Sequence, residues 1–380
     1  MPSLLNKKQM NRLYLAGGVI LIVFFLYYFA KYIKFYLNIH NAKPYTSKAF
    51  RTIPLLEEDF NTVTWLIHMY PPMHNAGAEW MAHAMNNSLV SSNYKVNVVL
   101  NSAALSEFER IHIIDKRKRD LVDSAILHSS LLISHLDMEP QAVQTAAIAK
   151  RPMVLVMHNN YRKHFLQEFI RVLPKNLYLI HNSYWLKEYY SQFNIPSIVV
   201  YPPVYWKEYN VETTREYVTL INLNSNKGGR ILYNIAKEMP DVKFLGVKGG
   251  YDGQIIKKGL SNLTYVENTP YIQSMYAKTD ILLVPSKEES WGRVAVEAMS
   301  SGIPVIAHPT PGLLESCGSA GIFCDRDDTA AWIREIHRLK NDATWREEIS
   351  QRCLKRAKEL DPTKQLDEMA KWLSTLKWRD

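Results

Sequence analysis

Short apolar runs recur along most of the chain and alternate with stretches of helical periodicity. In the first half, strand-like runs occupy residues 63–69, 96–100, 131–134, 153–157 and 177–180. In the second half they occupy residues 217–221, 242–246, 263–266, 281–284, 304–307 and 321–323. Continuous apolar runs between helices are typical of parallel strands that are covered on both faces. The pattern therefore predicts two doubly wound α/β domains, residues 43–204 and 205–360.

The join between the halves and the C-terminus have patterns of their own. Tyr201-Pro202-Pro203-Val204 is a stiff connector, because proline fixes its own φ angle. Asp361-Pro362 is a typical helix start, and it is followed at helical spacing by Leu366, Met369, Leu373 and Leu376. Residues 361–380 are therefore predicted to contain a final helix with one apolar face.

Residues 1–42 differ from the rest of the chain. Residues 13–30, LYLAGGVILIVFFLYYFA, carry no charge and are flanked on both sides by Lys and Arg. The run is just long enough to cross a bilayer. It is long for a signal peptide, and no small-residue cleavage site follows it. We therefore predict a single-pass membrane anchor, and the excess of Lys and Arg after the run favours a cytosolic location for the domains that follow.

The composition narrows the classes of protein. The chain has 380 residues, is 47% apolar and 22% charged, and carries a net charge of +9. The basic residues are scattered, and no zinc-finger, RRM or helix-turn-helix pattern appears, so a nucleic acid partner is not expected. A basic protein that handles anionic substrates at a membrane surface explains the charge equally well. The run at residues 116–119, KRKR, is most simply a solvated face, or else a contact with anionic lipid or a lipid-linked molecule.

The three cysteines predict neither a disulfide framework nor a metal site. Cys317, Cys324 and Cys353 are odd in number and lack the spacing of metal ligands. They are expected to be thiols in a reducing compartment.

The most informative stretch is residues 281–307, which predicts a strand, a polar loop, a helix and a second strand. Glu289 lies in the loop, and Glu297 lies one turn into a helix that begins near Gly292 or Arg293. Open α/β sheets bind ligands at this carboxyl edge. The first amides of the helix, up to Val294, suit a diphosphate, and the carboxylates can accept hydrogen bonds from hydroxyls. A sugar nucleotide fits this combination.

Three further loops carry candidate residues. Gly77 stands at the mouth of a helix, where a missing side chain lets the backbone approach a phosphate. Lys227 precedes two glycines after the strand at 217–221, in a loop that begins with Asn222. His158 follows the strand at 153–157. Taken singly, each also fits an ordinary turn or a structural residue.

The central segment is similar to the signature of retaining glycosyltransferases of family 4. That signature has Pro-Ser, a Glu, a Gly-containing turn and a second Glu, followed by Ala-Met, Gly and Pro-Val-Ile. The matching residues here are Pro285-Ser286, Glu289, Gly292, Glu297, Ala298-Met299, Gly302 and Pro304-Val305-Ile306. The resemblance extends from Val63 to the C-terminus. It implies a fold of the GT-B type, with two facing Rossmann-like domains, here behind the transmembrane helix, and with the final helix crossing back onto the first domain.

The resemblance also implies roles for the candidate residues. Glu289 would bind the hydroxyls of the donor sugar, Glu297 the ribose, and Lys227 with the amides at Arg293 and Val294 the diphosphate. His158 would reach the transferred sugar from the opposite domain. Gly77-Ala78-Glu79 matches a Gly-Gly-Ala-Glu loop except that Ala76 replaces its first Gly. Asn222 stands where the family usually has an Arg, so neutralisation of the diphosphate would rest more heavily on Lys227.

The implied reaction is transfer of a hexose-type sugar from a nucleotide diphosphate sugar to a glycan, lipid-linked or protein-linked acceptor, with retention at the anomeric carbon. No residue resembles a covalent nucleophile, which implies front-face attack. No cofactor or metal is expected, since fixed positive groups supply the charge. Two alternatives remain. A sugar-nucleotide epimerase of related fold would not need an anchor, and a catalytically silent membrane scaffold would not need Glu289, Glu297 and Lys227 together.

Overall fold

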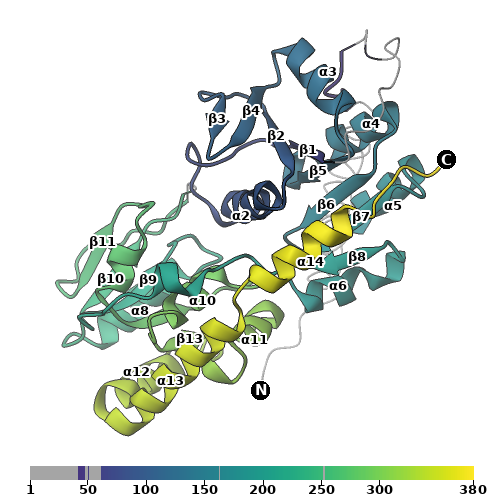
Figure 1. Cartoon of the computed structure of the whole chain (residues 1–380). Coiled ribbons are helices and arrows are strands. Elements are labelled where there is room, and N and C mark those ends of the chain that lie inside the picture. The colour runs from purple at the N-terminus through teal and green to yellow at the C-terminus, as the bar shows by residue number, and fades with distance from the viewer. Residues whose placement is uncertain (1–41, 48–49, 51–60, 162, 251–252) are drawn as a thin grey trace, which may run out of the picture.

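The computed structural model describes residues 42–47, 50, 61–161, 163–250 and 253–380. Their strands form two mainly parallel sheets, and each sheet with its helices makes one Rossmann-like α/β domain (Figure 1). The prediction of two such domains in a GT-B-like arrangement is confirmed.

The first sheet has eight strands in the order β3-β4-β2-β1-β5-β6-β7-β8. All neighbours are parallel except β3 and β4. The strands are β1 (Thr62–Leu66), β2 (Lys95–Leu100), β3 (Glu107–Phe108), β4 (Ile111–Asp115), β5 (Leu131–His135), β6 (Met153–Met157), β7 (Leu177–His181) and β8 (Ser197–Val199). The helices are α2 (Gly77–Ser91), α3 (Arg119–Leu127), α4 (Glu139–Ala149), α5 (Lys163–Val172) and α6 (Tyr184–Tyr190).

Alternate residues of the central strands enter two different cores. Val154 and Val156 of β6 pack in the cluster that includes α2, whereas Leu155 packs in the cluster that includes α4 and α5. Helices therefore cover both faces of the sheet. This double burial explains why the strands appear in the sequence as continuous apolar runs.

The second sheet has six parallel strands in the order β11-β10-β9-β12-β13-β14. They are β9 (Tyr217–Ile221), β10 (Phe244–Val247), β11 (Leu263–Val266), β12 (Thr279–Val284), β13 (Val305–Ala307) and β14 (Ile322–Phe323). The helices are α7 (Trp206–Tyr209), α8 (Gly229–Glu238), α9 (Gln273–Tyr276), α10 (Arg293–Met299), α11 (Pro311–Cys317), α12 (Thr329–Asn341) and α13 (Ala343–Glu359). The loop that carries Glu289 leaves the carboxyl end of β12, near the middle of this sheet.

Several predicted bounds were wrong. The first strand ends at Leu66 and not at residue 69, and β10 covers Phe244–Val247 and not residues 242–246. Strands β3, β4 and β8 were not predicted: β3 and β8 are short and lie at the sheet edges, and in β4 buried residues alternate with exposed or half-buried ones.

The basic run at 116–119 is largely solvated, as predicted, since Arg117, Lys118 and Arg119 are exposed, but three of its side chains also donate hydrogen bonds to the protein. Lys116 Nζ donates to Asn101 Oδ1 at 2.7 Å, Arg117 Nε donates to Asp115 Oδ1 at 2.8 Å, and Arg119 Nη1 donates to the carbonyl of Tyr45 at 2.6 Å. These contacts fix the start of α3 to the strands beside it.

The predicted membrane anchor at residues 13–30 lies outside the described residues. Within the part of the chain that the structure describes, no helix is both long and apolar enough to span a bilayer. The anchor therefore stays a prediction.

The C-terminal helix α14 (Thr363–Leu373) returns the chain to the first domain (Figure 1). Leu366, Met369 and Leu373 are buried in the same cluster as Met81 and Met85 of α2. The apolar stripe of this helix thus completes the core of a domain whose other elements lie far earlier in the sequence.

Two buried carboxylates have opposite surroundings. Asp280, which is 4% exposed, pairs with Lys340 Nζ at 3.1 Å and with Arg346 Nη2 at 2.5 Å. Glu79, in the first turn of α2, is fully buried, and neither of its carboxylate oxygens accepts a hydrogen bond from the residues that the structure describes. His68 Nε2 and His74 Nε2 lie 3.9 Å from Glu79 Oε1, beyond hydrogen-bond distance.

We expect Glu79→Gln to leave the thermal midpoint of unfolding unchanged or to raise it. A buried charge without a hydrogen-bonded partner is costly, and the neutral amide has nearly the same shape. Asp280→Asn is the matched control. It should lower stability by about 3 kcal/mol, the lower end of the range for breaking a buried pair, because Lys340 is 34% exposed. Equal losses in the two variants, measured by thermal unfolding, would mean that the two histidines compensate the charge of Glu79.

Candidate active site

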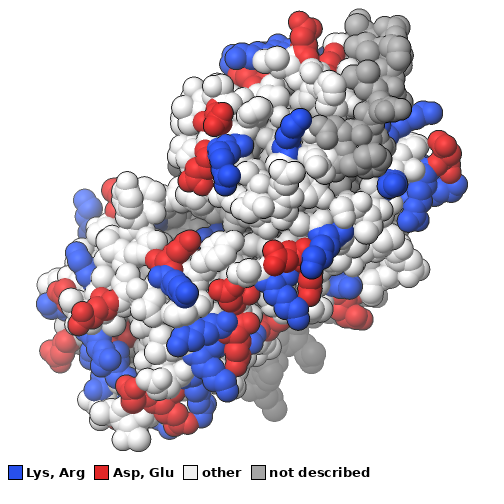
Figure 2. Space-filling model, in the orientation of Figure 1, with Lys and Arg blue, Asp and Glu red and all other residues white. Residues whose placement is uncertain are grey.

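A cavity of about 650 Å³ lies between the two domains. Gly77 lines it from the first domain, and Asn222, Lys227, Glu289, Arg293, Val294 and Glu297 line it from the second. Every predicted site residue except His158 therefore lines this one cavity. On the face shown in Figure 2, Lys and Arg are interspersed with Asp and Glu and form no continuous basic surface.

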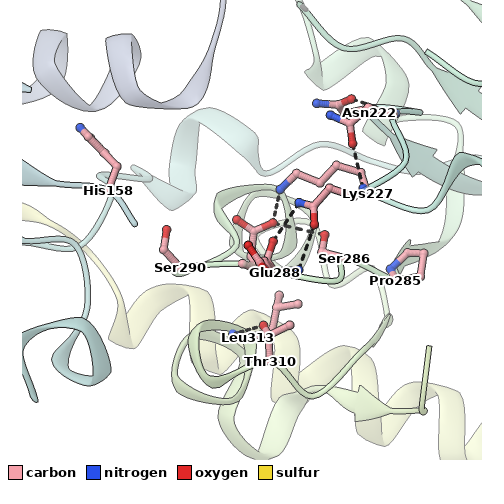
Figure 3. Close-up of polar contacts among 12 residues, drawn as sticks. His158, Asn222, Lys227, Pro285, Ser286, Glu288, Ser290, Thr310 and Leu313 are labelled. Carbon is pink, nitrogen blue, oxygen red and sulfur yellow. Dashed lines mark hydrogen bonds and ion pairs between the residues drawn. The ribbon is translucent and has the colours of Figure 1, made fainter. Parts of the chain in front are cut away.

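Lys227 and Glu289 meet in this cavity. Lys227 Nζ donates a hydrogen bond to Glu289 Oε2, and Ser286 Oγ donates to the same oxygen at 3.3 Å (Figure 3). Asn226 fixes the two loops to each other, since its side chain donates to the carbonyl of Glu288 and accepts from its amide, both at 3.0 Å. An ammonium group and a carboxylate are thus held side by side. Nothing in the sequence singled out Asn226 for this role.

Two glycines permit this close packing. Gly228 has a φ of +93°, and a Cβ atom there would lie 2.6 Å from the ring of Pro285. Gly292 has a φ of +92°, and a Cβ atom there would lie 2.5 Å from the Leu313 side chain. Both the backbone conformation and the available space therefore require glycine. As predicted, α10 begins at Arg293, so the amides of Arg293 and Val294 have no partner within the helix.

Glu297 is buried and held by neighbours on both oxygens. Arg293 Nε donates to Glu297 Oε1 at 2.5 Å, and the hydroxyl of Tyr276 donates to Glu297 Oε2 at 2.7 Å. Burial and the charge of Glu297 raise the pKa of Tyr276 well above its usual value, so its hydroxyl stays a donor. Arg293 Nη2 also donates to the hydroxyl of Tyr209 at 2.8 Å. Neither tyrosine could be identified from the sequence. Each lies far from α10 along the chain, and nothing in its local sequence indicates a hydrogen bond to Glu297 or Arg293.

Asn222 and Gly77 line the cavity but are constrained differently. Asn222 has a φ of +69°, and its Oδ1 accepts from Gln254 Nε2 at 3.1 Å, so its carbonyl end is already engaged. A Cβ atom at Gly77 would meet no atom within 4 Å. The protein itself therefore does not require glycine at position 77. The α2 helix begins there, with its first amides beside the cavity.

His158 lies apart from the cavity lining. Its Nε2 is 3.0 Å from His135 Nδ1, and its ring points away from Ser290 (Figure 3). Asn182 Nδ2 connects the region to the second domain, since it donates to Ser290 Oγ at 2.7 Å. The predicted contact of His158 with a sugar stays a prediction.

Polar contacts join the domains around the cavity. Asn75 Nδ2 donates to Asn268 Oδ1 at 2.9 Å and to the carbonyl of Thr269 at 3.2 Å, and Trp80 Nε1 donates to Asn75 Oδ1 at 2.8 Å. On another side, Trp185 Nε1 donates to the carbonyl of Ser290 at 2.7 Å. Sequence reasoning missed all of these, because hydrogen bonds between distant loops leave no local pattern.

The described residues contain no group of three or more His, Cys, Asp or Glu side chains arranged to hold a metal ion. Cys317, Cys324 and Cys353 are buried and unpaired. Burial raises the pKa of Cys317 to about 12 and that of Cys324 to about 11, so neither is a ready nucleophile.

Residues 246–360 match the family model for glycosyl transferases group 1. Among curated proteins, the chain is 34% identical over 113 residues to the O-antigen chain mannosyltransferase B of Escherichia coli, which covers 28% of this chain and 29% of that protein. It is 35% identical over 82 residues to the D-inositol 3-phosphate glycosyltransferase of Salinispora arenicola, covering 21% of this chain and 18% of that protein. The matches thus span less than a third of the length of these relatives.

Solved structures extend the similarity over both domains. The Anabaena protein HepE, determined with UDP and glucose, superposes with a TM-score of 0.68 at 18% identity, covering 83% of this chain and 99% of that one. WaaG, a glycosyltransferase of lipopolysaccharide biosynthesis, gives a TM-score of 0.61 at 13% identity, covering 82% and 99%. At such identities the likeness concerns the fold alone. Residues 246–360 thus match the family model for glycosyl transferases group 1, and the two-domain fold is similar to those of HepE and WaaG.

Proposed function

We propose that the protein is a retaining glycosyltransferase that moves a hexose-type sugar from a nucleotide diphosphate sugar to a glycan, lipid-linked or protein-linked acceptor. One observation carries the proposal: Lys227, Glu289, Glu297 and two helix starts line a single cavity between the domains. The group 1 match over residues 246–360 supports it, because those residues include Glu289, Arg293 and Glu297.

The contact between Lys227 and Glu289 suits the reacting end of such a donor. In a sugar diphosphate, the β-phosphate and the sugar hydroxyls are neighbours across one glycosidic oxygen. A cation for the phosphate and an acceptor for the hydroxyls must therefore lie side by side, as Lys227 Nζ and Glu289 Oε2 do. The amides of Arg293 and Val294, and those that begin α2 at Gly77, would add dipoles directed at the diphosphate.

Glu297 would bind the ribose. Arg293 and Tyr276 occupy one site on each carboxylate oxygen, and every such oxygen can accept a second hydrogen bond. The same neighbours keep the carboxylate fixed before the nucleotide arrives. Preorganisation of this kind lowers the entropy cost of binding.

The chemical step breaks the bond between the anomeric carbon and the diphosphate oxygen and forms one to the acceptor oxygen on the same face. The acceptor hydroxyl gives its proton to the departing diphosphate, whose growing negative charge Lys227 stabilises. His158 would contact the sugar from the first domain once the donor is bound. The reaction needs no cofactor. A membrane location would follow from the predicted anchor and would suit a lipid-linked acceptor.

A panel of sugar nucleotides tests the proposal on the full chain. A true donor at about a hundred times its Kd should stabilise the protein by roughly 2.7 kcal/mol, seen as a raised thermal midpoint. Release of the nucleoside diphosphate with that donor then identifies a transferase. Isomerisation of the donor without release of the nucleoside diphosphate would identify an epimerase. If no sugar nucleotide binds, the scaffold alternative would remain. The comparisons favour neither of these alternatives.

Lys227→Ala should reduce turnover by about 10²–10³, because it removes a preorganised charge from the leaving diphosphate. Lys287→Ala is the matched control, since Lys287 is exposed in the facing loop and does not line the cavity. The measurement is kcat with the donor found in the panel. Near-normal turnover in Lys227→Ala would remove Lys227 from the mechanism.

The two glutamates should fail in different ways. Glu297→Gln should weaken binding of the nucleoside diphosphate by roughly 1–3 kcal/mol, through weaker hydrogen bonds to the ribose. Glu289→Gln should leave that affinity nearly intact while lowering kcat. Calorimetric titration and steady-state kinetics, with thermal unfolding as the check on folding, separate the two. The assignment of roles is wrong if both variants lose affinity equally.

A further inference from the structure

Part of the cavity is lined by residues to which the proposed function assigns no role. Its first-domain wall carries Glu109, from the turn between β3 and β4, with His83 and Asn87 of α2. Its second-domain wall carries Glu208 of α7 and Gln273 of α9. A carboxylate thus stands on each side.

Glu109 is held in place at the cavity wall. Its Oε2 lies 3.1 Å from His83 Nε2 and accepts from Asn87 Nδ2 at 3.0 Å. Tyr70 supports His83 from behind, with its hydroxyl 3.0 Å from His83 Nδ1. Burial lowers the pKa of His83, which keeps the ring neutral, so the carboxylate charge is not cancelled by this neighbour.

Glu208 faces Glu109 from the other domain. The Glu208 side chain is exposed at the rim of the cavity. Partial desolvation raises the pKa of Glu208, Arg293 opposes this, and the charge of Glu109 raises it further. Among the described residues, no hydrogen bond or ion pair engages the Glu208 carboxylate, because Arg293 is already bound to Glu297 and Tyr209. Gln273 lies beside this residue, since its Nε2 donates to the backbone carbonyl of Glu208 at 3.4 Å.

The order of groups along the cavity places the base of a nucleotide here. Lys227 and Glu289 lie at the reacting end, and Arg293 links Glu297 to Tyr209, the neighbour of Glu208. A donor with its diphosphate at Lys227 and its ribose at Glu297 therefore extends its base toward Glu208 and Gln273. This step rests on the proposed function.

The chemistry of carboxylates then selects among the bases. An ionised carboxylate only accepts hydrogen bonds. Guanine offers two adjacent donors, its ring N1–H and its exocyclic amine, which match the two oxygens of one carboxylate. Uracil offers a single N–H between two carbonyl oxygens, and these would face the negative charge. Cytosine and adenine offer an amine beside a ring nitrogen that is itself an acceptor.

We infer that Glu208 recognises the base of the donor, with Glu109 opposite, and that the donor is a guanosine diphosphate sugar. The amide of Gln273 is placed to donate to the O6 atom of guanine. Specificity for the base thus arises where the two domains face each other, and not from the diphosphate site.

Calorimetric titration of the full chain with GDP, UDP, ADP and CDP tests this inference. A bidentate contact discriminates by about 1–3 kcal/mol, so GDP should bind about 5- to 150-fold more tightly than UDP. Glu208→Gln should weaken the binding of GDP and leave the binding of UDP nearly unchanged, so that the ratio of the UDP and GDP dissociation constants falls toward one. Glu109→Gln should lower the ratio less. Glu212→Gln is the control, because Glu212 is exposed and lies outside the cavity lining.

The outcomes distinguish this inference from the proposed function. Tightest binding of UDP, ADP or CDP, or equal binding of all four, would overturn the choice of guanine and leave the sugar-nucleotide site intact. An unchanged ratio in Glu208→Gln would overturn the role of Glu208. Absence of binding by every nucleoside diphosphate would overturn both proposals together.

Discussion

The contact between Lys227 and Glu289 is the constraint around which the cavity is arranged. These residues follow β9 and β12, which are adjacent and parallel, so the loops at their carboxyl ends must meet. Asn226 locks the loops together, and Gly228 lets one of them lie against Pro285. The pairing of a cation with a hydroxyl acceptor is therefore a consequence of strand order, and one loop alone could not produce it.

The two cationic side chains that line the cavity, Arg293 and Lys227, differ in how far their charge is available to a ligand. Arg293 is used within the protein, where it holds Glu297 and Tyr209. The Lys227 ammonium group is paired with the Glu289 carboxylate and is itself 26% exposed. Positive charge is thus available near Lys227, while carboxylates dominate toward Glu208 and Glu109. This polarity along the cavity gives an asymmetric ligand one preferred direction, with its anionic group at the Lys227 end.

The sequence predicted the parts of this structure that depend on local patterns. Apolar runs located most strands, and the glycines and glutamates of residues 281–307 located the central loop and the start of α10, because burial and turn geometry limit which residues fit there. Tyr209, Tyr276, Asn75 and Asn226 were missed. Their contacts join segments that are distant in the chain, and a hydrogen bond leaves no periodicity in either partner. The edge strands were missed for a related reason, since incomplete burial weakens the apolar signal.

The interface between the domains is built differently from either interior. The three apolar clusters follow the division into domains, counting α14 with the first, except that Val204 of the connector is buried in the cluster of the second domain. Polar contacts join the domains: Asn75 to Asn268, Trp185 to Ser290, and Glu315 with the amides of Tyr184 and Trp185 at 2.7 and 3.0 Å. Separating the domains would break these hydrogen bonds, which water can replace, while both cores stay packed. A base bound at Glu208 and Glu109 would touch both walls, so its recognition would add contacts between the domains to these hydrogen bonds.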